Sequence, residues 1–114
     1  MKGMVWYYTY EDGLKQLQRI KMDYERMNIK TVKERFSRFG SLVEFENGDC
    51  WKMASGTESS RGNKINVSYI DRRIEEDMVQ CVIRPCTMAY PFQAFRYYGP
   101  CPKEKEVEYK WNIS

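Results

Sequence analysis

The chain has 114 residues, which is enough for one domain with a hydrophobic core of its own. Its 19 basic side chains against 16 acidic ones give a net charge of +3, so bulk charge alone does not indicate a nucleic-acid-binding protein. Histidine is absent, which removes the commonest general base and every Cys-His or Ser-His catalytic pair. The composition therefore disfavours an enzyme, and we expect no catalytic residues, no cofactor and no metal site.

The cysteines contain no C-x-x-C pair, and this spacing disfavours a four-thiolate zinc site. The sequence has neither an apolar secretory segment at its start nor an apolar run of about 18 residues. We expect a cytoplasmic protein without a membrane partner, in which the thiols are reduced. The thiols belong to Cys50, Cys81, Cys86 and Cys101.

The pattern of elements predicts the α/β (or α+β) class: a single domain over residues 1–114 with a mixed sheet of about five strands, a β-hairpin and two to four helices. Residues 4–10 are rich in aromatic and β-branched side chains, apolar on both sides, which predicts a central strand. Thr9 and Asp12 then resemble a helix cap. Apolar residues at spacings of three and four predict an amphipathic helix that ends near Asn28. These residues are Leu14, Leu17, Ile20, Tyr24 and Met27.

Residues 29–40 allow two interpretations, a short helix that ends at Gly40 or a short strand over 29–32. The helical spacing of Phe36 and Phe39 favours the helix. This is also the most basic window of the chain, and with its aromatics it is a candidate for binding phosphates and stacking bases. We expect the two phenylalanines to enter the core rather than to stack on bases. The basic residues are Lys30, Lys33, Arg35 and Arg38.

Residues 41–55 read as two alternating runs joined by Asn47-Gly48, which predicts a β-hairpin with a two-residue turn. That turn would pair Phe45 with Cys50 and Glu44 with Trp51. Residues 55–64 contain no large apolar side chain. Their glycines would let backbone N–H groups face an anion, while a solvated loop is the alternative interpretation. The binding candidates here are Ser55, Gly56, Arg61, Gly62, Asn63 and Lys64.

Residues 65–71 alternate, with Ile65, Val67 and Tyr69 predicted on one side of a strand that ends at Asp71. In α/β proteins, polar residues at strand ends commonly form sites. Asp71 would also serve as the cap of a following helix that ends at Pro85. Two basic residues would then occupy the first turn, where the helix dipole disfavours cations, so we expect a partner or a salt bridge for them. The binding candidates are Asp71, Arg72 and Arg73. The buried stripe of the helix would comprise Ile74, Met78, Cys81 and Val82.

The last third of the chain is dense in aromatics and proline. Residues 86–102 predict at most a short helix that begins at Pro91 and ends at Gly99. Residues 106–113 alternate apolar with polar side chains and predict a half-buried strand, either at a sheet edge or exchanged with a second copy. A homodimer through this strand follows from the second reading.

The order strand, helix, hairpin with Phe45-x-Asn47-Gly48, Ser55-Gly56, Arg61-Gly62 and a strand closing on Asp71 resembles the inner part of the ATPase domain of phage large terminases and related helicase-like proteins. The resemblance covers about residues 4–76. It implies a nucleotide-hydrolase scaffold whose glycine-bearing loop precedes the strand that bears the metal-binding acid.

Two departures separate the sequence from that family. No G-x-x-x-x-G-K-[ST] phosphate-binding loop exists in the chain. Asp71 is followed by Arg72, where the family usually has the glutamate that orients the attacking water. A protein that lacks both of these features should not hydrolyse ATP efficiently.

Three functions are therefore compatible with the sequence. The favoured one is a small non-enzymatic protein of phage or prophage type, located in the host cytoplasm, that engages or inhibits a macromolecular partner such as a CRISPR nuclease of the host defence. The second is a nucleic-acid-binding accessory protein that uses the basic windows 30–38 and 61–73. The third is a protein that sequesters a nucleotide signal through residues 55–64.

Overall fold

The computed structural model describes residues 1–37, 40–55, 64–87 and 93–101. These residues form one six-stranded mixed sheet in the order β2-β3-β4-β1-β5-β6. Strand β1 (Lys2–Tyr7) lies in the middle, parallel to both β4 (Cys50–Ser55) and β5 (Val67–Asp71). Strand β6 (Ala94–Tyr98) extends the parallel part, and β3 (Leu42–Phe45) and β2 (Thr31–Arg35) extend the other side in antiparallel pairing. The expected α/β class with a mixed sheet and a hairpin is confirmed.

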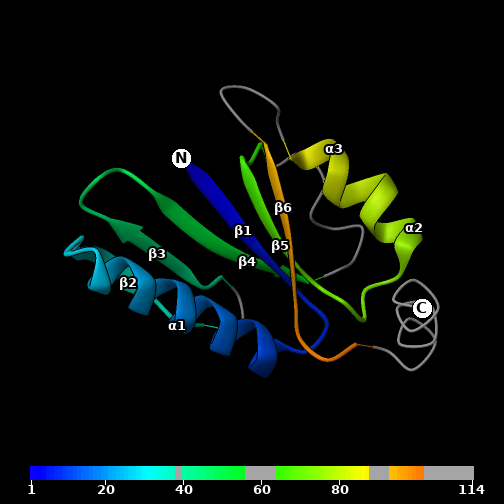
Figure 1. Cartoon of the computed structure of the whole chain (residues 1–114), viewed down its shortest axis with the longest axis horizontal. Coiled ribbons are helices and arrows are strands. Elements are labelled where there is room, and N and C mark those ends of the chain that lie inside the picture. The colour runs from blue at the N-terminus through cyan, green and yellow to red at the C-terminus, as the bar shows by residue number, and fades with distance from the viewer. Residues whose placement is uncertain (38–39, 56–63, 88–92, 102–114) are drawn as a thin grey trace, which may run out of the picture.

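Helices cover opposite faces of this sheet (Figure 1). Helix α1 (Tyr10–Arg26) packs through Leu17, Ile20 and Tyr24 on the face that carries Val5 and Trp51. The other face is covered by a helical segment of three parts, α2 (Glu76–Met78), the π-helical turn η2 (Val79–Ile83) and α3 (Arg84–Cys86). Successive residues of a strand point to opposite faces. Because both faces of the central strands are covered, those strands are apolar on both sides.

The first strand and helix follow the prediction with small changes of boundary. The strand covers 2–7 rather than 4–10, because Thr9 is already the N-cap of α1 and accepts a hydrogen bond from the Asp12 N–H. Met27, expected in the buried stripe, is 60% exposed, since the helix ends at Arg26 and Asn28 takes a positive φ of 62°. No helix in the described part of the chain is both long and apolar enough to cross a bilayer.

The hairpin over 41–55 is present, but its register differs from the prediction by one residue. Glu44 pairs with Cys50 and Val43 with Trp51, and the Phe45 N–H bonds to the Asp49 carbonyl. The loop between Phe45 and Asp49 therefore has three residues, and Gly48 in it adopts a φ of 94°. A type I turn closed by a glycine with positive φ gives this geometry. The observed register places the buried Val43 and Trp51 opposite each other on one face, whereas the predicted register opposed the half-exposed Glu44 to Trp51.

The prediction of a helix in 29–40 is wrong, and the strand interpretation is closer. Residues 31–35 form edge strand β2, which pairs with β3 from Thr31 to Arg35. The apparent helical stripe does not reach the core, because Val32 is 62% and Phe36 is 40% exposed. Hydrogen bonds to β3 were available to a strand in this position, and tertiary pairing overrode the local helical spacing.

The expected short helix between Pro91 and Gly99 is also wrong, because residues 94–98 form β6 alongside β5. Its side chains alternate between the two faces, with Phe95 against the α2–α3 side and Tyr98 against the α1 side. Aromatic side chains suit this half-buried position in a sheet. The predicted strand 106–113, and with it the proposed exchange between copies, lies outside the described residues.

The predicted helix after Asp71 starts later than expected and continues past Pro85. Its N-cap is Glu75, and Asp71 is instead the last residue of β5. Proline cannot donate to the carbonyl four residues earlier and its ring crowds that carbonyl. The helix widens into η2 just before this point, where the Arg84 N–H bonds to the Val79 carbonyl, and Pro85 is accommodated inside the helix.

The buried stripe of the helix after Asp71 also differs from the predicted one. It comprises Val79, Val82, Ile83 and Cys86, while Cys81 is exposed. The alternation of β5 holds for Val67 and Tyr69 on the α1 side, but Ile65 precedes the strand and packs with the opposite cluster. None of the four cysteines, all of which the structure describes, forms a disulfide.

Candidate functional site

The carboxyl ends of the four parallel strands lie side by side at one end of the sheet. The last residues of these strands are Tyr7, Ser55, Asp71 and Tyr98. After β1 the chain turns to α1 on one face, and after β5 it turns to the helix on the opposite face. Neighbouring strands whose connections diverge in this way form the switch point of an open α/β sheet, where such folds bind ligands. The candidate site therefore lies between the ends of β1 and β5.

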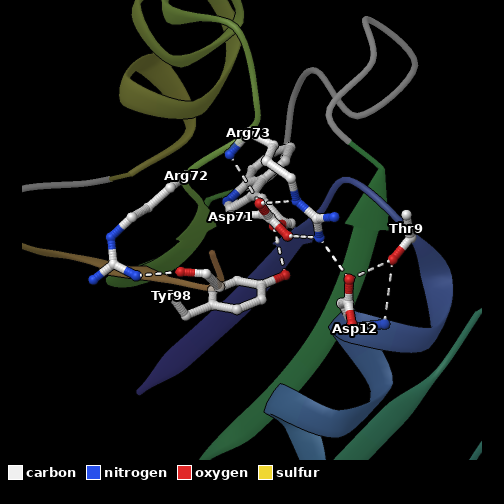
Figure 2. Close-up of polar contacts among 8 residues, drawn as sticks. Thr9, Asp12, Asp71, Arg72, Arg73 and Tyr98 are labelled. Atoms are coloured by element: carbon white, nitrogen blue, oxygen red, sulfur yellow. Dashed lines mark hydrogen bonds and ion pairs between the residues drawn. The ribbon is translucent and has the colours of Figure 1, made fainter. Parts of the chain in front are cut away.

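This switch point is spanned by an ion-pair network, which we call the Asp71–Arg73–Asp12 bridge (Figure 2). The Arg73 guanidinium donates from Nε to Asp71 Oδ1 at 3.0 Å and from Nη2 to Asp71 Oδ2 at 2.7 Å. Its Nη2 also donates to Asp12 Oδ2 at 2.5 Å, and the Arg73 backbone N–H donates to Asp71 Oδ1 at 2.9 Å. The fully buried Asp71 side chain, with 0% exposure, thus has both oxygens bonded to a single arginine.

Asp12 enters the bridge from the first turn of α1. Thr9 Oγ1 donates to Asp12 Oδ2 at 2.9 Å, and the Thr9 cap fixes the start of the helix. A helix N-terminus favours negative charge, and here the chain supplies its own carboxylate. The Arg73 hydrogen bond, helped by that of Thr9, lowers the pKa of Asp12, and the two carboxylates raise the pKa of Arg73.

The end of β6 closes the other side of the bridge. Gly99 has a φ of 84°, and a Cβ there would lie 3.3 Å from Asp71 Oδ2, so glycine suits both the backbone and the close approach of the carboxylate. The Tyr98 hydroxyl donates to the Trp6 carbonyl at 3.0 Å, and burial, with the nearby Asp71 charge, raises the pKa of Tyr98. Arg72 donates from Nη1 to the Gly99 carbonyl. The salt bridge expected for the Arg-Arg pair is therefore present at Arg73, and Arg72 fastens β5 to β6.

A cleft of about 290 Å³ opens beside the bridge on the α2 side. Tyr8, which follows β1, lies with its ring centroid 4.9 Å from the Arg73 guanidinium carbon, a cation–π contact. Sequence reasoning found Ser55 and Arg73 of this cleft but assigned Asp12 only to a helix cap and did not select Tyr8. The signal that could have found Tyr8 is its position directly after the central strand. The lining residues are Tyr7, Tyr8, Ser55, Arg73, Ile74, Glu75 and Met78.

The other predicted binding residues do not join this site. Lys64 lines a separate cavity of about 110 Å³ with Lys2 and Gly3 at the amino ends of the strands. At about 3.3 Å per residue, the stretch from Lys64 to Asp71 is roughly 20 Å long. The expectation that the 55–64 segment and Asp71 share one surface therefore fails for Lys64, whereas Ser55, the other described residue of this segment, lies at the same end of the sheet as Asp71. Gly56, Arg61, Gly62 and Asn63 lie outside the described residues.

The basic window 30–38 lies at the far edge of the sheet. Lys33 and Arg35 are on β2, and Lys30 immediately precedes it. Four strand spacings of about 4.8 Å separate β2 from β5, which places this window roughly 19 Å from Arg72 and Arg73. The basic side chains of β2 therefore do not form one patch with Arg72 and Arg73. Arg38 lies outside the described residues.

The bonding of Asp71 also bears on metal binding. Both carboxylate oxygens, which would be the ligands of Mg²⁺, are occupied by Arg73. Within residues 1–37, 40–55, 64–87 and 93–101, no group of three cysteine or acidic side chains is arranged to hold a metal ion. At the switch point, the Asp71 carboxylate is therefore engaged in an ion pair with Arg73, which also pairs with Asp12.

Solved structures similar to this fold are those of the large terminase from a thermophilic bacteriophage. One crystal form matches with a TM-score of 0.59 over 98% of this chain and 30% of the terminase, at 13% sequence identity. A second crystal form matches with a TM-score of 0.60 over 87% of this chain and 25% of the terminase. The same terminase in complex with ATP-gamma-S gives a TM-score of 0.58, also at 13% identity.

The likeness confirms the resemblance of the scaffold to that of a terminase. It shows the fold alone, because the identity is low and the chain spans less than a third of the terminase length. No protein-family profile matches the sequence, and no curated protein matches it significantly.

Proposed function

We propose that this chain is a non-hydrolysing binding protein of phage or prophage type, built on a nucleotide-hydrolase scaffold, that engages and inhibits a macromolecular partner such as a host defence nuclease. The observation that carries the proposal is the Asp71–Arg73–Asp12 bridge. The protein's own ion pairs occupy the switch point, where related scaffolds bind a ligand. In this proposal, the scaffold acts by binding a partner through its surfaces.

The connection from β1 to α1 supports the absence of hydrolysis. It consists of Tyr8 and Thr9, too short for a loop that wraps a triphosphate with successive backbone N–H groups. The helix end that would attract a phosphate carries the Asp12 carboxylate, and like charges repel. A nucleotide would have to displace Arg73 from a fully buried aspartate before a metal could approach.

The hydrolysis part is tested with the purified full chain and Mg²⁺-ATP or Mg²⁺-GTP. We expect no phosphate release above background and no shift of the thermal midpoint. The variant Asp12→Asn, which removes the carboxylate at the helix end, serves as the matched control. Turnover by the wild-type chain that Asp71→Asn abolishes would contradict the proposal.

The binding part is tested by expressing the tagged chain in an infected bacterial host, purifying it over a range of salt concentrations, and assaying the activity of what co-purifies. We expect a protein partner at a fixed ratio whose activity falls when the chain is added back. A chain that emerges alone at every ionic strength counts against the proposal.

One observation favours nucleic-acid binding as a second candidate: edge strand β2 keeps its basic side chains exposed next to Val32 and Phe36. Such binding would fall steeply with salt. Charge reversal at Lys30 and Lys33 would weaken it without touching the bridge.

A further inference from the structure

A groove of about 790 Å³ runs along α1 on the face opposite the α2–α3 segment. One wall is the side of α1 that carries Arg19, Met22 and Arg26, which stand three and four residues apart and therefore share one flank of the helix. The floor and the other wall come from β5 and β6, with Tyr69 and Tyr98. The groove is distinct from the cleft beside the Asp71–Arg73–Asp12 bridge, although Arg72, Tyr98 and Gly99, which border the bridge, also line it.

The groove exists because one helix is too narrow for the sheet. A helix with its side chains is about 10–12 Å wide, which covers roughly two strands at about 4.8 Å each. In the described part of the chain, α1 packs mainly over β1 and β4. The neighbouring stretch of β5 and β6 on the same face is thus left as the floor of the groove.

The chemistry of the groove is cationic and aromatic. Arg72 at the end of β5 joins the two arginines of α1, and the acidic group in the lining is Asp23, which lies 3.6 Å from Arg26. Apolar surface stays accessible beside these charges, because Met22 is 51% exposed and Tyr69 is half-buried. Seven of the ten lining residues are arginine, tyrosine or methionine, and none is lysine.

That composition distinguishes between two kinds of anionic partner. Arginine, tyrosine and methionine are enriched in protein–protein interfaces and lysine is depleted there, and arginine and tyrosine are frequent hot spots. A site that follows a nucleic-acid backbone gathers lysines and arginines at several phosphates, whereas here the lysines lie elsewhere and an acid is part of the wall.

We propose that the groove is a docking surface for an acidic, partly apolar segment of a partner protein. Carboxylates of that segment pair with Arg19, Arg26 and Arg72, while its apolar side chains cover Met22 and Tyr69. The proposal rests on the proposed function, because it names the surface by which the chain engages its partner.

The test measures fluorescence anisotropy of a labelled synthetic peptide of glutamate, leucine and tyrosine, with the full chain at low and moderate ionic strength. We expect binding that weakens with salt and that Arg19→Glu/Arg26→Glu weakens by about tenfold or more. The matched control is Lys52→Glu/Arg84→Glu, which makes the same charge change at exposed side chains on the opposite face of the sheet and should leave binding within about twofold. Met22→Gln, a neutral change of an exposed side chain, should weaken binding by about two- to fivefold and keeps the test valid if the charge reversal harms folding.

Several results would overturn the docking surface. These are no peptide binding by the wild-type chain, equal losses in both double variants, or tighter binding of an oligothymidine that Arg19→Glu/Arg26→Glu abolishes. A change from dimer to monomer in that variant would assign the groove to a second copy instead. If the variant still binds the co-purified partner, the groove proposal fails and the proposed function stands, whereas ATP turnover would refute the function itself.

Discussion

Replacing Arg73 by glutamine is the most direct test of the bridge. Asp71 is fully buried, and in the variant its carboxylate keeps the Arg73 backbone N–H while it loses both guanidinium contacts, at 3.0 and 2.7 Å. A buried charge that loses its partner costs about 3–5 kcal/mol of folding free energy. Domains of this size have about 5–15 kcal/mol in total, so we expect a large loss, equivalent to a fall of about 10–20 °C in the thermal midpoint.

The assay is equilibrium unfolding in urea, followed by the fluorescence of the buried Trp6 and Trp51. The matched control is Arg19→Gln, an arginine of the exposed helix surface, which should change stability by no more than about 0.5 kcal/mol. The double variant Asp71→Asn/Arg73→Gln should recover part of the loss, because no charge is then buried. If Arg73→Gln unfolds within about 1 kcal/mol of the wild type, the bridge does not hold this edge of the sheet and the reasoning is refuted.

Three other polar contacts lead to further predictions. Ser68→Ala removes the acceptor of the buried Trp6 Nε1–H, a 3.0 Å hydrogen bond, and should cost about 1–3 kcal/mol in urea unfolding, whereas no loss would mean that the indole finds another acceptor. Tyr24→Phe leaves the Trp51 Nε1–H without its 3.1 Å partner. Burial also raises the pKa of Tyr24 from 10.0 to about 12, so wild-type stability should decline between these pH values, and the decline should be smaller in the variant, where Tyr98 still contributes to it. The Arg73 guanidinium lowers the pKa of Asp12, so the stability that this contact gives is present above pH 3.8 and is lost as the pH falls through the lowered pKa. In an acid titration of stability, Asp12→Asn should lack this loss.

The fold was predictable from the sequence where local pattern and tertiary partner agree. The central strand, the first helix and the Asn47-Gly48 hairpin have periodicities that the sheet and helix positions also require. Strands β2 and β6 were not predictable, because spacing of aromatic residues by three or four fits a helix as well as it fits an edge strand, and the choice depends on neighbours supplied by β3 and β5.

The candidate site was predictable in part for the same reason. Asp71 could be placed at a strand end, because that inference uses neighbouring residues. The two arginines after it led to the expectation of a partner or a salt bridge, although they precede the helix and do not occupy its first turn. The partner of Arg73 on α1 is Asp12, 61 residues away, and nothing in the local sequence marks that pairing. The burial of Asp71, which closes the site, depends on Tyr98 and Gly99 and follows from the tertiary structure alone.

The central place of β1 has a consequence for synthesis. Its hydrogen-bonding partners begin at Cys50 and at Val67, so when the first strand leaves the ribosome the polypeptide that will flank it has not yet been made. Translation proceeds at about 5–20 residues per second, and pairing across such long intervals is intrinsically slow. We therefore expect the nascent chain to hold α1 and the β3–β4 hairpin as early local units, with the apolar Val5 and Trp6 waiting for chaperones or for the second half of the protein.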